Sequence, residues 1–241
     1  MRAKVAVIVG AGDAIGTAIT RKFAQRGLTV CALRRNADRL APLVEELRSK
    51  GHEAHAFSCD ARREEQVIER FAAIEQQVGD IEVVVFNVGA NVPLGILDTD
   101  SRKFFKIWEM ACFAGFLTGR EAARVMSVRK RGTILFTGAT ASVRGAAGFA
   151  AFASAKHGLR ALAQSMAREL GPQNIHVAHV VIDAAVDTQW ILENFPEATQ
   201  LKENDGLVDP GALAENYVML YDQPRNAWTF ELDLRPWIER W

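Results

Sequence analysis

The sequence lacks the patterns that mark disulfide-rich, membrane-spanning and repeat proteins. Its 241 residues include only 3 cysteines, none in a CxxC pair, which favours structural thiols in a reduced protein over a disulfide framework. No apolar run approaches the ~20 residues that a bilayer-spanning helix needs. Internal repeats and low-complexity segments are absent as well. These absences predict a globular chain that does not cross a membrane.

The sequence also lacks a net charge. Lysine plus arginine number 29, and aspartate plus glutamate also number 29. A neutral chain gives no reason to expect nucleic acid or an anionic membrane as a partner, so the expected partner is a small-molecule substrate. The first strand is predicted to begin within about four residues of Met1, which leaves no signal peptide. Together with the cysteine usage, this predicts a cytoplasmic protein.

Two residue types that often carry chemistry are scarce or badly placed. The chain has 2 tyrosines, Tyr217 and Tyr221, both in a helix predicted near the C-terminus. His176 and His179 lie three apart on a predicted strand and therefore point to opposite faces. They cannot form a metal-binding pair with each other, so the sequence predicts no metal site.

The first feature that is present is a glycine-rich turn after an apolar run. Residues 5–16 read Val-Ala-Val-Ile-Val-Gly-Ala-Gly-Asp-Ala-Ile-Gly, and a helical pattern follows over residues 17–26. The continuous apolar run is typical of a strand buried on both faces. Glycines let the backbone approach a ligand closely, and the helix N-terminus presents free N–H groups to an anion. The stretch therefore predicts a dinucleotide-binding turn built on Gly10, Gly12 and Gly16.

Strands and helices alternate along the rest of the chain. This alternation predicts an α/β fold with a Rossmann-type, doubly wound parallel sheet of about seven strands and helices on both faces. No linker is visible, so residues 1–241 are expected to form a single domain. Residues 188–206 are less regular and follow a strand end, where a substrate lid is expected. The predicted strands after the first are 28–33, 54–58, 83–87, 133–137, 175–182 and 228–234, and the predicted helices are 37–49, 64–78, 102–126, 149–170 and 210–222.

The ends of these strands carry residues suited to a dinucleotide. Arg34 and Arg35 follow the second strand, where an arginine accommodates the 2′-phosphate of NADP(H) and an acid would bind the ribose of NAD(H). They favour NADP(H) over NAD(H). Asp60 follows the third strand, where it either binds the adenine edge or caps the next helix. Asn87 and Gly89 close the fourth strand, and the glycine suits either a close approach to the cofactor or a tight turn.

At this point the chain resembles the short-chain dehydrogenase/reductase family over nearly its whole length. The family pattern is TGxxxGxG, NNAG and YxxxK; this chain has Gly-Ala-Gly-Asp-Ala-Ile-Gly from Gly10, Phe-Asn-Val-Gly at 86–89 and Phe-Ala-Ser-Ala-Lys at 152–156. The resemblance implies a Rossmann fold, an oxidoreductase and NAD(P) binding by the motif residues, including Ile15 and Asp60. It also implies a homodimer or homotetramer built from the two long helices.

The resemblance weakens at the catalytic residues. In the family a tyrosine is the general acid/base, a lysine one helical turn later binds the nicotinamide ribose, and a serine and an asparagine assist. Here Lys156 is present, but Phe152 stands in the tyrosine position, Ala139 in the serine position and Ala111 in the asparagine position. Thr188 matches a family threonine that contacts the carboxamide of the cofactor.

Two functions therefore stay open. The first is a divergent NADP(H)-dependent oxidoreductase acting on a carbonyl or alcohol, with Thr140 or Ser142 as substitute hydroxyl donors near Lys156. Asp183 is a further possible donor, whereas Asp187 is expected to cap a helix. The alternative is a non-catalytic nucleotide-binding or protein-interaction member of the fold. The cofactor-binding residues favour both functions equally.

Overall fold

The computed structural model of the protein describes residues 2–12, 14–89 and 91–239, so Asp13 of the glycine motif lies outside the described residues. Within these ranges, apolar runs form one seven-stranded sheet with the order β3-β2-β1-β4-β5-β6-β7. All its strand pairs are parallel. The predicted doubly wound parallel sheet is confirmed. The strands are β1 (Ala3–Val9), β2 (Thr29–Arg34), β3 (Ala54–Ser58), β4 (Gly79–Phe86), β5 (Gly132–Thr137), β6 (Ile175–Ile182) and β7 (Glu231–Leu234).

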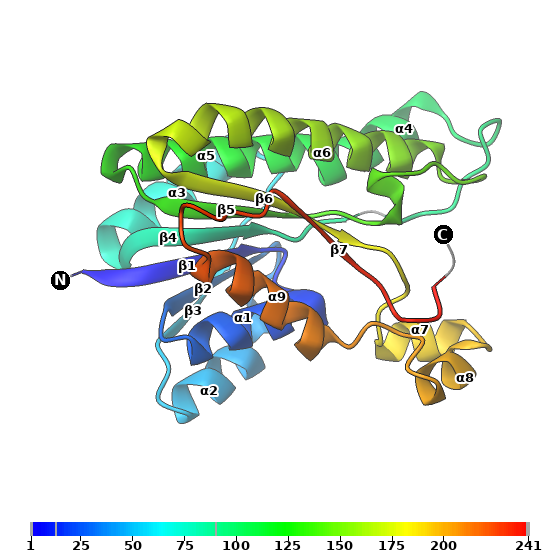
Figure 1. The fold of residues 1–241 in the computed structure, drawn as a ribbon, viewed down its shortest axis with the longest axis horizontal. Helices are drawn as coiled ribbons and strands as arrows, with labels where there is room; N and C mark the ends of the chain where they lie inside the picture. Colours follow the sequence, from blue (N-terminus) through cyan, green and yellow to red (C-terminus); the bar gives the residue numbers. More distant parts are fainter. Residues whose placement is uncertain (1, 13, 90, 240–241) are drawn as a thin grey trace.

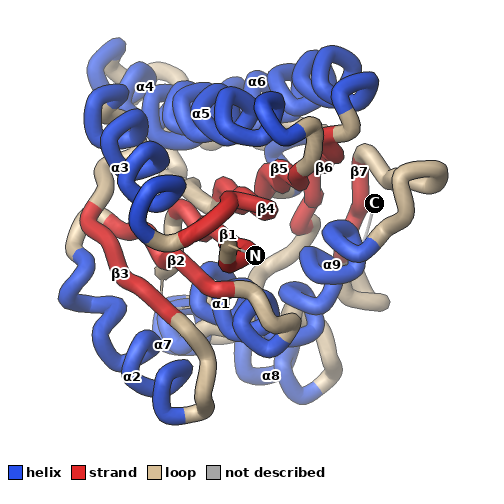
Figure 2. The backbone as a smooth tube through the Cα atoms, turned by 90° about the vertical axis from the view of Figure 1, so that its left-hand side faces the viewer, coloured by secondary structure: helices blue, strands red, loops and turns tan. Residues whose placement is uncertain are grey.

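Helices cover both faces of the sheet, which gives three layers (Figures 1 and 2). Alternate strand residues point to opposite faces, so Val7 packs under α3, α5 and α6, whereas Ile8 packs against α1, α2 and α9. The helices are α1 (Ile15–Gln25), α2 (Ala41–Ser49), α3 (Glu64–Gln77), α4 (Ser101–Trp108), α5 (Ala114–Arg129), α6 (Ala150–Leu170), α7 (Gln189–Asn194), α8 (Ala198–Glu203) and α9 (Pro210–Asp222).

The strand order reverses beside β1, and this reversal positions the site. β1 pairs with β2 on one side and with β4 on the other, with Val9 opposite both Leu33 and Phe86. The chain leaves these strands toward opposite faces, so the two crossovers diverge and leave a crevice at the carboxyl ends. The glycine turn after Val9 and the loop after Phe86 border this crevice.

Most predicted elements are present, with several corrections. β4 begins at Gly79 instead of residue 83, and α5 ends at Arg129 instead of residue 126. The long helix expected at 102–126 is interrupted by a π-helical turn, Glu109–Phe113, which separates α4 from α5. The helix expected from residue 37 begins with a 3₁₀ turn, Ala37–Leu40, and the last strand begins at Glu231 instead of residue 228. The irregular segment 188–206 contains the short helices α7 and α8. Propensity patterns do not resolve such tight or widened turns.

The segment that carries α7 and α8 is pinned at its base. Val186 and Val208 form an isolated parallel bridge, and the Asp187 N–H donates to the Val208 carbonyl at 2.9 Å. The two helices project from one end of the molecule in Figure 1. The two flanks of the segment 188–206 therefore lie side by side, just beyond the end of β6. Within the described ranges, none of the helices combines the length and apolarity needed to cross a bilayer.

Candidate functional site

Two cavities meet at the carboxyl ends of β1 and β4. The first, of about 640 Å³, extends toward β5, β6 and α6. The second, of about 600 Å³, extends toward β2 and the loop after β3. They form one continuous trough across the sheet edge, because they share lining residues. The shared residues are Gly10, Gly12, Asn87, Val88 and Gly89.

The glycines of the first turn have different structural roles. Gly10 has a φ of +87°, and a Cβ there would lie 2.5 Å from the Asn87 carbonyl oxygen. A Cβ on Gly16 would lie 2.4 Å from the Gly10 oxygen, so this glycine lets α1 pack on the turn. At Gly12 a Cβ would meet nothing within 4 Å, because this residue faces the open trough. Asn87 holds the turn by donating from Nδ2 to the Gly10 oxygen at 3.1 Å.

The N-terminus of α1 opens onto the same space. The helix has no side-chain cap and no acidic residue in its first turn, and Ile15 and Gly16 line the first cavity. Uncapped N–H groups at the positive end of a helix bind anions well. The bare face of Gly12 leaves room for a pyrophosphate beside them. The residues present therefore fit the phosphates of a dinucleotide.

The second cavity is surrounded by cations. Arg34 and Arg35 line it, together with Arg39 and Arg62. Asp60 also lines it and accepts two hydrogen bonds from Arg62, from Nε at 2.9 Å and from Nη2 at 2.6 Å. These hydrogen bonds lower the pKa of Asp60 below its usual range. The cavity thus offers an anion several arginines and one already paired carboxylate.

Asp60 does not cap the next helix. The residue before α3 is Arg63, and that helix has no side-chain cap. Asp60 accepts instead from the N–H of Arg62 within the preceding turn, at 3.2 Å. The capping alternative for Asp60 is therefore wrong, and its place in the wall of the second cavity remains.

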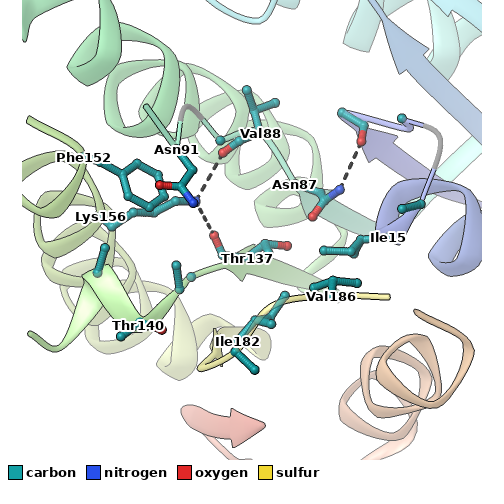
Figure 3. Close-up of a pocket in the computed structure, with 18 of the residues that line it drawn as sticks. Ile15, Asn87, Val88, Asn91, Thr137, Thr140, Phe152, Lys156, Ile182 and Val186 are labelled. Atoms are coloured by element: carbon teal, nitrogen blue, oxygen red, sulfur yellow. Dashed lines mark hydrogen bonds between the residues drawn. The ribbon is translucent and has the colours of Figure 1, made fainter. Parts of the chain in front are cut away.

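Lys156 is the buried cation of the first cavity (Figure 3). α6 carries it under the sheet edge, where Nζ donates to the Thr137 oxygen at 2.8 Å and to the Val88 oxygen at 3.3 Å. The ring centroid of Phe152 lies 5.9 Å from Nζ, one helical turn earlier. Burial lowers the pKa of Lys156 to about 8, because desolvation disfavours the charged ammonium.

The hydroxyl residues near Lys156 are already engaged. Thr140 lines the first cavity, and its hydroxyl donates to Asp183 at 2.6 Å. Ser142 is fully buried behind the cavity wall, and its hydroxyl accepts from the Ala139 N–H at 3.1 Å. Of the predicted site residues, only Ser142 is absent from the described lining of both cavities.

Neither tyrosine reaches the first cavity. Tyr217 is buried on the α9 side of the sheet, where its hydroxyl bonds the Thr137 hydroxyl at 2.8 Å. Burial raises the pKa of Tyr217 far above its usual range. Tyr221 packs edge-on against Phe23 of α1, on that same side of the sheet. Phe152 and Ala139 supply an apolar wall to the cavity instead.

Thr188, at the start of the segment 188–206, borders the first cavity beside β6. Thr188 lines the cavity and is the N-cap of α7, accepting from the Ile191 N–H at 3.2 Å. The expectation that Asp187 caps this helix is wrong, because the Asp187 carboxylate pairs with Lys202 at 2.9 Å. That ion pair joins the base of the segment 188–206 to α8.

The histidines do not gather into a metal site. The Nε2 atom of His176 lies 2.8 Å from the Thr229 oxygen, and the Nδ1 atom of His179 lies 3.0 Å from Glu231. Burial lowers the pKa of His179 to about 4, so this ring is neutral near pH 7. Within the described ranges, no group of three or more His, Cys, Asp or Glu side chains could hold a metal ion.

Some lining residues had no signal in the sequence. Arg39 and Arg62 reach the second cavity from separate turns, and Asn91 and Arg144 reach the first from loops. The spacing Asp-x-Arg at Asp60 is the one local hint of the Arg62 pairing. The others are brought to the trough only by the fold.

The comparisons with known proteins agree with this geometry. The family model described as short chain dehydrogenase matches residues 4–196. Zerumbone synthase of Zingiber zerumbet is 30% identical over 200 residues, which are 82% of this chain and 74% of that protein. A crystal structure of a short-chain dehydrogenase from Rhodopseudomonas palustris is 50% identical, with a TM-score of 0.85 over 98% of this chain and 100% of that one.

A third similar protein was solved with a bound nucleotide. It is an alcohol dehydrogenase from the archaeon Thermococcus sibiricus complexed with 5-hydroxy-NADP. It is 27% identical, with a TM-score of 0.86 over 98% of both chains. From the family model, the relatives and the shared fold together, the chain belongs to the short-chain dehydrogenase family.

Proposed function

We propose that this protein binds NADP(H) and interconverts a carbonyl compound and its alcohol. The single observation that carries the proposal is the continuous trough, which joins an uncapped helix N-terminus, an arginine-lined end and a buried lysine. The relative from Thermococcus sibiricus, complexed with 5-hydroxy-NADP, supports the nature of the cofactor. When bound, the cofactor supplies or removes a hydride at the substrate carbon.

The chain's own residues would hold this cofactor along the trough. The backbone at Gly10, Gly12, Ile15 and Gly16 would bind the pyrophosphate. The adenosine end would lie among Arg34, Arg35 and Asp60, where two arginines suit a 2′-phosphate. Asn87 and Gly89 would border the middle, and Lys156 and Thr188 the nicotinamide end.

Lys156 is the group we assign to proton transfer. Among the described residues that line the first cavity, the threonine hydroxyls are poor acids, and Thr137 and Thr140 are already hydrogen-bonded. Arginine is not deprotonated in proteins, so Arg144 cannot serve. The pKa of Lys156, about 8, lies near the working pH, where a general acid is most effective.

This assignment gives a direction to the pH dependence. Reduction needs the protonated ammonium, so its rate falls as the pH rises through about 8, and oxidation needs the neutral amine. Cys112 and His179 are the titratable groups that interact with Lys156 from the neighbouring elements. Burial raises the pKa of Cys112 and lowers the pKa of His179 to about 4, so both stay uncharged over this range.

The alternative is a protein that binds the nucleotide without using it. Phe152, Ala139 and Ala111 favour it, because they stand where the family carries its acid, its hydroxyl donor and its asparagine. General acid–base catalysis contributes typically ~10²–10⁴-fold to a reaction rate. Orientation of the reactants contributes separately, so some turnover could remain without the acid. A direct test must therefore separate binding from turnover.

Fluorescence titration with NADPH and NADH tests the binding step. We expect NADPH to bind about tenfold more tightly, because of the arginines at the adenosine end. Equal affinities would contradict the preference for NADP(H). Absence of binding would contradict the proposal that the protein binds a nicotinamide cofactor.

Hydride transfer and the lysine titration test the second step. We expect slow reduction of ketones and aldehydes whose rate follows the Lys156 titration, observed independently by NMR of ¹³Cε-labelled lysine. Lys156→Arg keeps a cation but cannot release its proton, so it should retain NADPH and lose turnover. A wild-type protein that binds NADPH and transfers no hydride would establish the non-catalytic alternative.

We also propose that the protein is a homodimer or a homotetramer. Four aromatic rings form a row along one side of α4 and α5, with Phe105 59% exposed at one end and Phe116 38% exposed at the other. Trp108 and Phe113 between them are partly buried. Exposed aromatic side chains of this kind are typical of an interface. Light scattering of the wild type and of Phe105→Glu, with Val128→Glu as a control, measures the effect.

A further inference from the structure

The substrate half of the first cavity is apolar except at one edge. Its walls come from the ends of β5 and β6, the start of α6 and the base of the lid. The apolar lining residues are Ala139, Ala141, Ala146, Phe149, Phe152, Ile182, Ala184 and Val186. Among the described lining residues of this cavity, only Lys156 and Arg144 are ionised. Arg144 lies beside the aromatic wall and is absent from every step proposed above.

Arg144 is held from one edge only. Its Nη2 donates to the Asp183 carboxylate at 3.0 Å, and Asp183 is itself buried at 2% exposure. Asp183 is fixed in turn by the Thr140 hydroxyl at 2.6 Å and by Arg235 at 3.4 Å. Within the described part of the chain, Nε and Nη1 of Arg144 donate no hydrogen bond. The Arg144 side chain is 41% exposed at the mouth of the pocket. A guanidinium with donors left over at the rim of an apolar pocket is suited to a carboxylate.

A carboxylate of the chain already stands near this guanidinium. Glu239, in the C-terminal segment, approaches Arg144 Nη2 at 3.6 Å, too far for a hydrogen bond. The segment is anchored on the lid, where Trp237 Nε1 donates to the Asn204 oxygen at 3.1 Å. The surroundings of Arg144 therefore admit an anion, and the resident one is loosely held.

We propose that Arg144 binds the carboxylate of the substrate, and that the substrate is an oxo acid or hydroxy acid with an apolar body. The proposal rests on the proposed function, since it names the substrate class of that same site. The apolar body packs on Phe149 and Phe152, and the carboxylate takes the place of Glu239. Asp183 positions Arg144, and Lys156 faces the same cavity from α6.

Selectivity for an acid follows because one edge of the pocket carries the Arg144 cation and the other walls are apolar. A charge-assisted hydrogen bond is roughly twice as strong as a neutral one. A neutral amide of the same shape offers the guanidinium one uncharged carbonyl oxygen, and its NH₂ group finds no acceptor there, because guanidinium only donates. The acid should therefore bind more tightly than its amide, and the difference should depend on Arg144.

Calorimetric titration with 4-phenylbutanoate and 4-phenylbutanamide tests this proposal on the full chain, with and without NADPH. We expect the acid to bind roughly tenfold more tightly than the amide to the wild type. Arg144→Gln should bring the two affinities together, whereas Arg168→Gln, the same change on the exposed side of α6, should leave the preference intact. A wild type without preference, or a preference that survives in Arg144→Gln, overturns the proposal.

Glu239→Gln provides a test that does not disturb the Asp183 pair. Removal of the competing carboxylate should strengthen 4-phenylbutanoate binding by roughly threefold and leave the amide unchanged. An unchanged or weaker affinity for the acid overturns the proposal even where Arg144→Gln fails to fold. The titration without NADPH measures the acid preference independently of the cofactor. Failure of NADPH to bind would therefore overturn the proposed function and leave the assignment of Arg144 to be decided by the acid preference.

Discussion

The two halves of the trough differ in whether backbone or side-chain atoms line them. Where the two cavities meet, the lining is mostly backbone, at Gly10, Gly12 and Gly89 and at the first turn of α1, and arginine side chains line the far end of the second cavity. At the proposed substrate end the lining consists of side chains, from Phe152 and Arg144 to the alanines of the wall. A backbone cradle depends on a few glycines and hardly on other identities. A side-chain cavity changes its chemistry with each substitution, and in this chain Phe152 and Lys156 line it together.

The strongest test of the backbone cradle is Gly12→Val. A Cβ at Gly12 would meet no protein atom within 4 Å, so the variant should fold normally. The side chain would fill the space beside the α1 N-terminus, and NADPH affinity should fall by about 1,000-fold. Fluorescence titration and thermal unfolding measure the two effects. Gly145→Val, also without a neighbour within 4 Å, should change neither; a Gly12→Val protein that still binds NADPH would show that the cofactor lies elsewhere.

The second test measures how burial of Lys156 changes the free energy of unfolding. Its pKa is about 8 in the folded protein and 10.5 ordinarily, so the unfolded chain binds more protons between these values. The contribution of Lys156 to the free energy of unfolding should therefore rise with pH across this window, by roughly 3 kcal/mol in total, measured as the difference between the wild type and a variant without the ammonium. In Lys156→Met this rise should disappear. Urea unfolding of both proteins between pH 7 and pH 10.5 measures it, and parallel curves would mean that Lys156 is not desolvated.

The same contrast explains what the sequence could predict. The glycine turn, the arginines after β2 and the order of strands and helices are local patterns, and each appears where it was expected. The π-helical turn Glu109–Phe113 was missed, because it is a small widening of a continuous helical pattern.

The substrate end depends on long-range contacts. Arg144 and Asp183 are 39 residues apart in the sequence and meet only after β5 and β6 pair. Thr140 was expected to offer its proton to a substrate, but its partner Asp183 comes from the neighbouring strand end. Side-chain engagement of this kind has no local signature, so the sequence alone could not show that the Thr140 hydroxyl is already bound to Asp183.

The third test restores the missing hydroxyl with Phe152→Tyr. The ring centroid lies 5.9 Å from Lys156 Nζ, so a tyrosine hydroxyl would enter the field of the ammonium, which favours its ionised form. We expect reduction of a ketone to accelerate by about tenfold or more, since a positioned acid contributes typically ~10²–10⁴-fold. Phe149→Tyr adds the same hydroxyl to the same cavity and should give no gain. Single-turnover rates with saturating NADPH compare the two; equal rates would mean that the cavity no longer holds a substrate against this wall.

The smallest expected effect concerns the discrimination between NADPH and NADH. Arg35 lines the second cavity from the turn after β2, with Arg34 and Arg39 nearby. Because several arginines share this end, loss of one should weaken NADPH binding by only about threefold. NADH has no 2′-phosphate, so its affinity should not change in Arg35→Ser. Titration of both nucleotides, with Arg168→Ser as the matched control, measures this difference. A parallel loss for NADH and NADPH would show that Arg35 supports the fold of this turn, and the charge-based preference would then rest on Arg34 and Arg39.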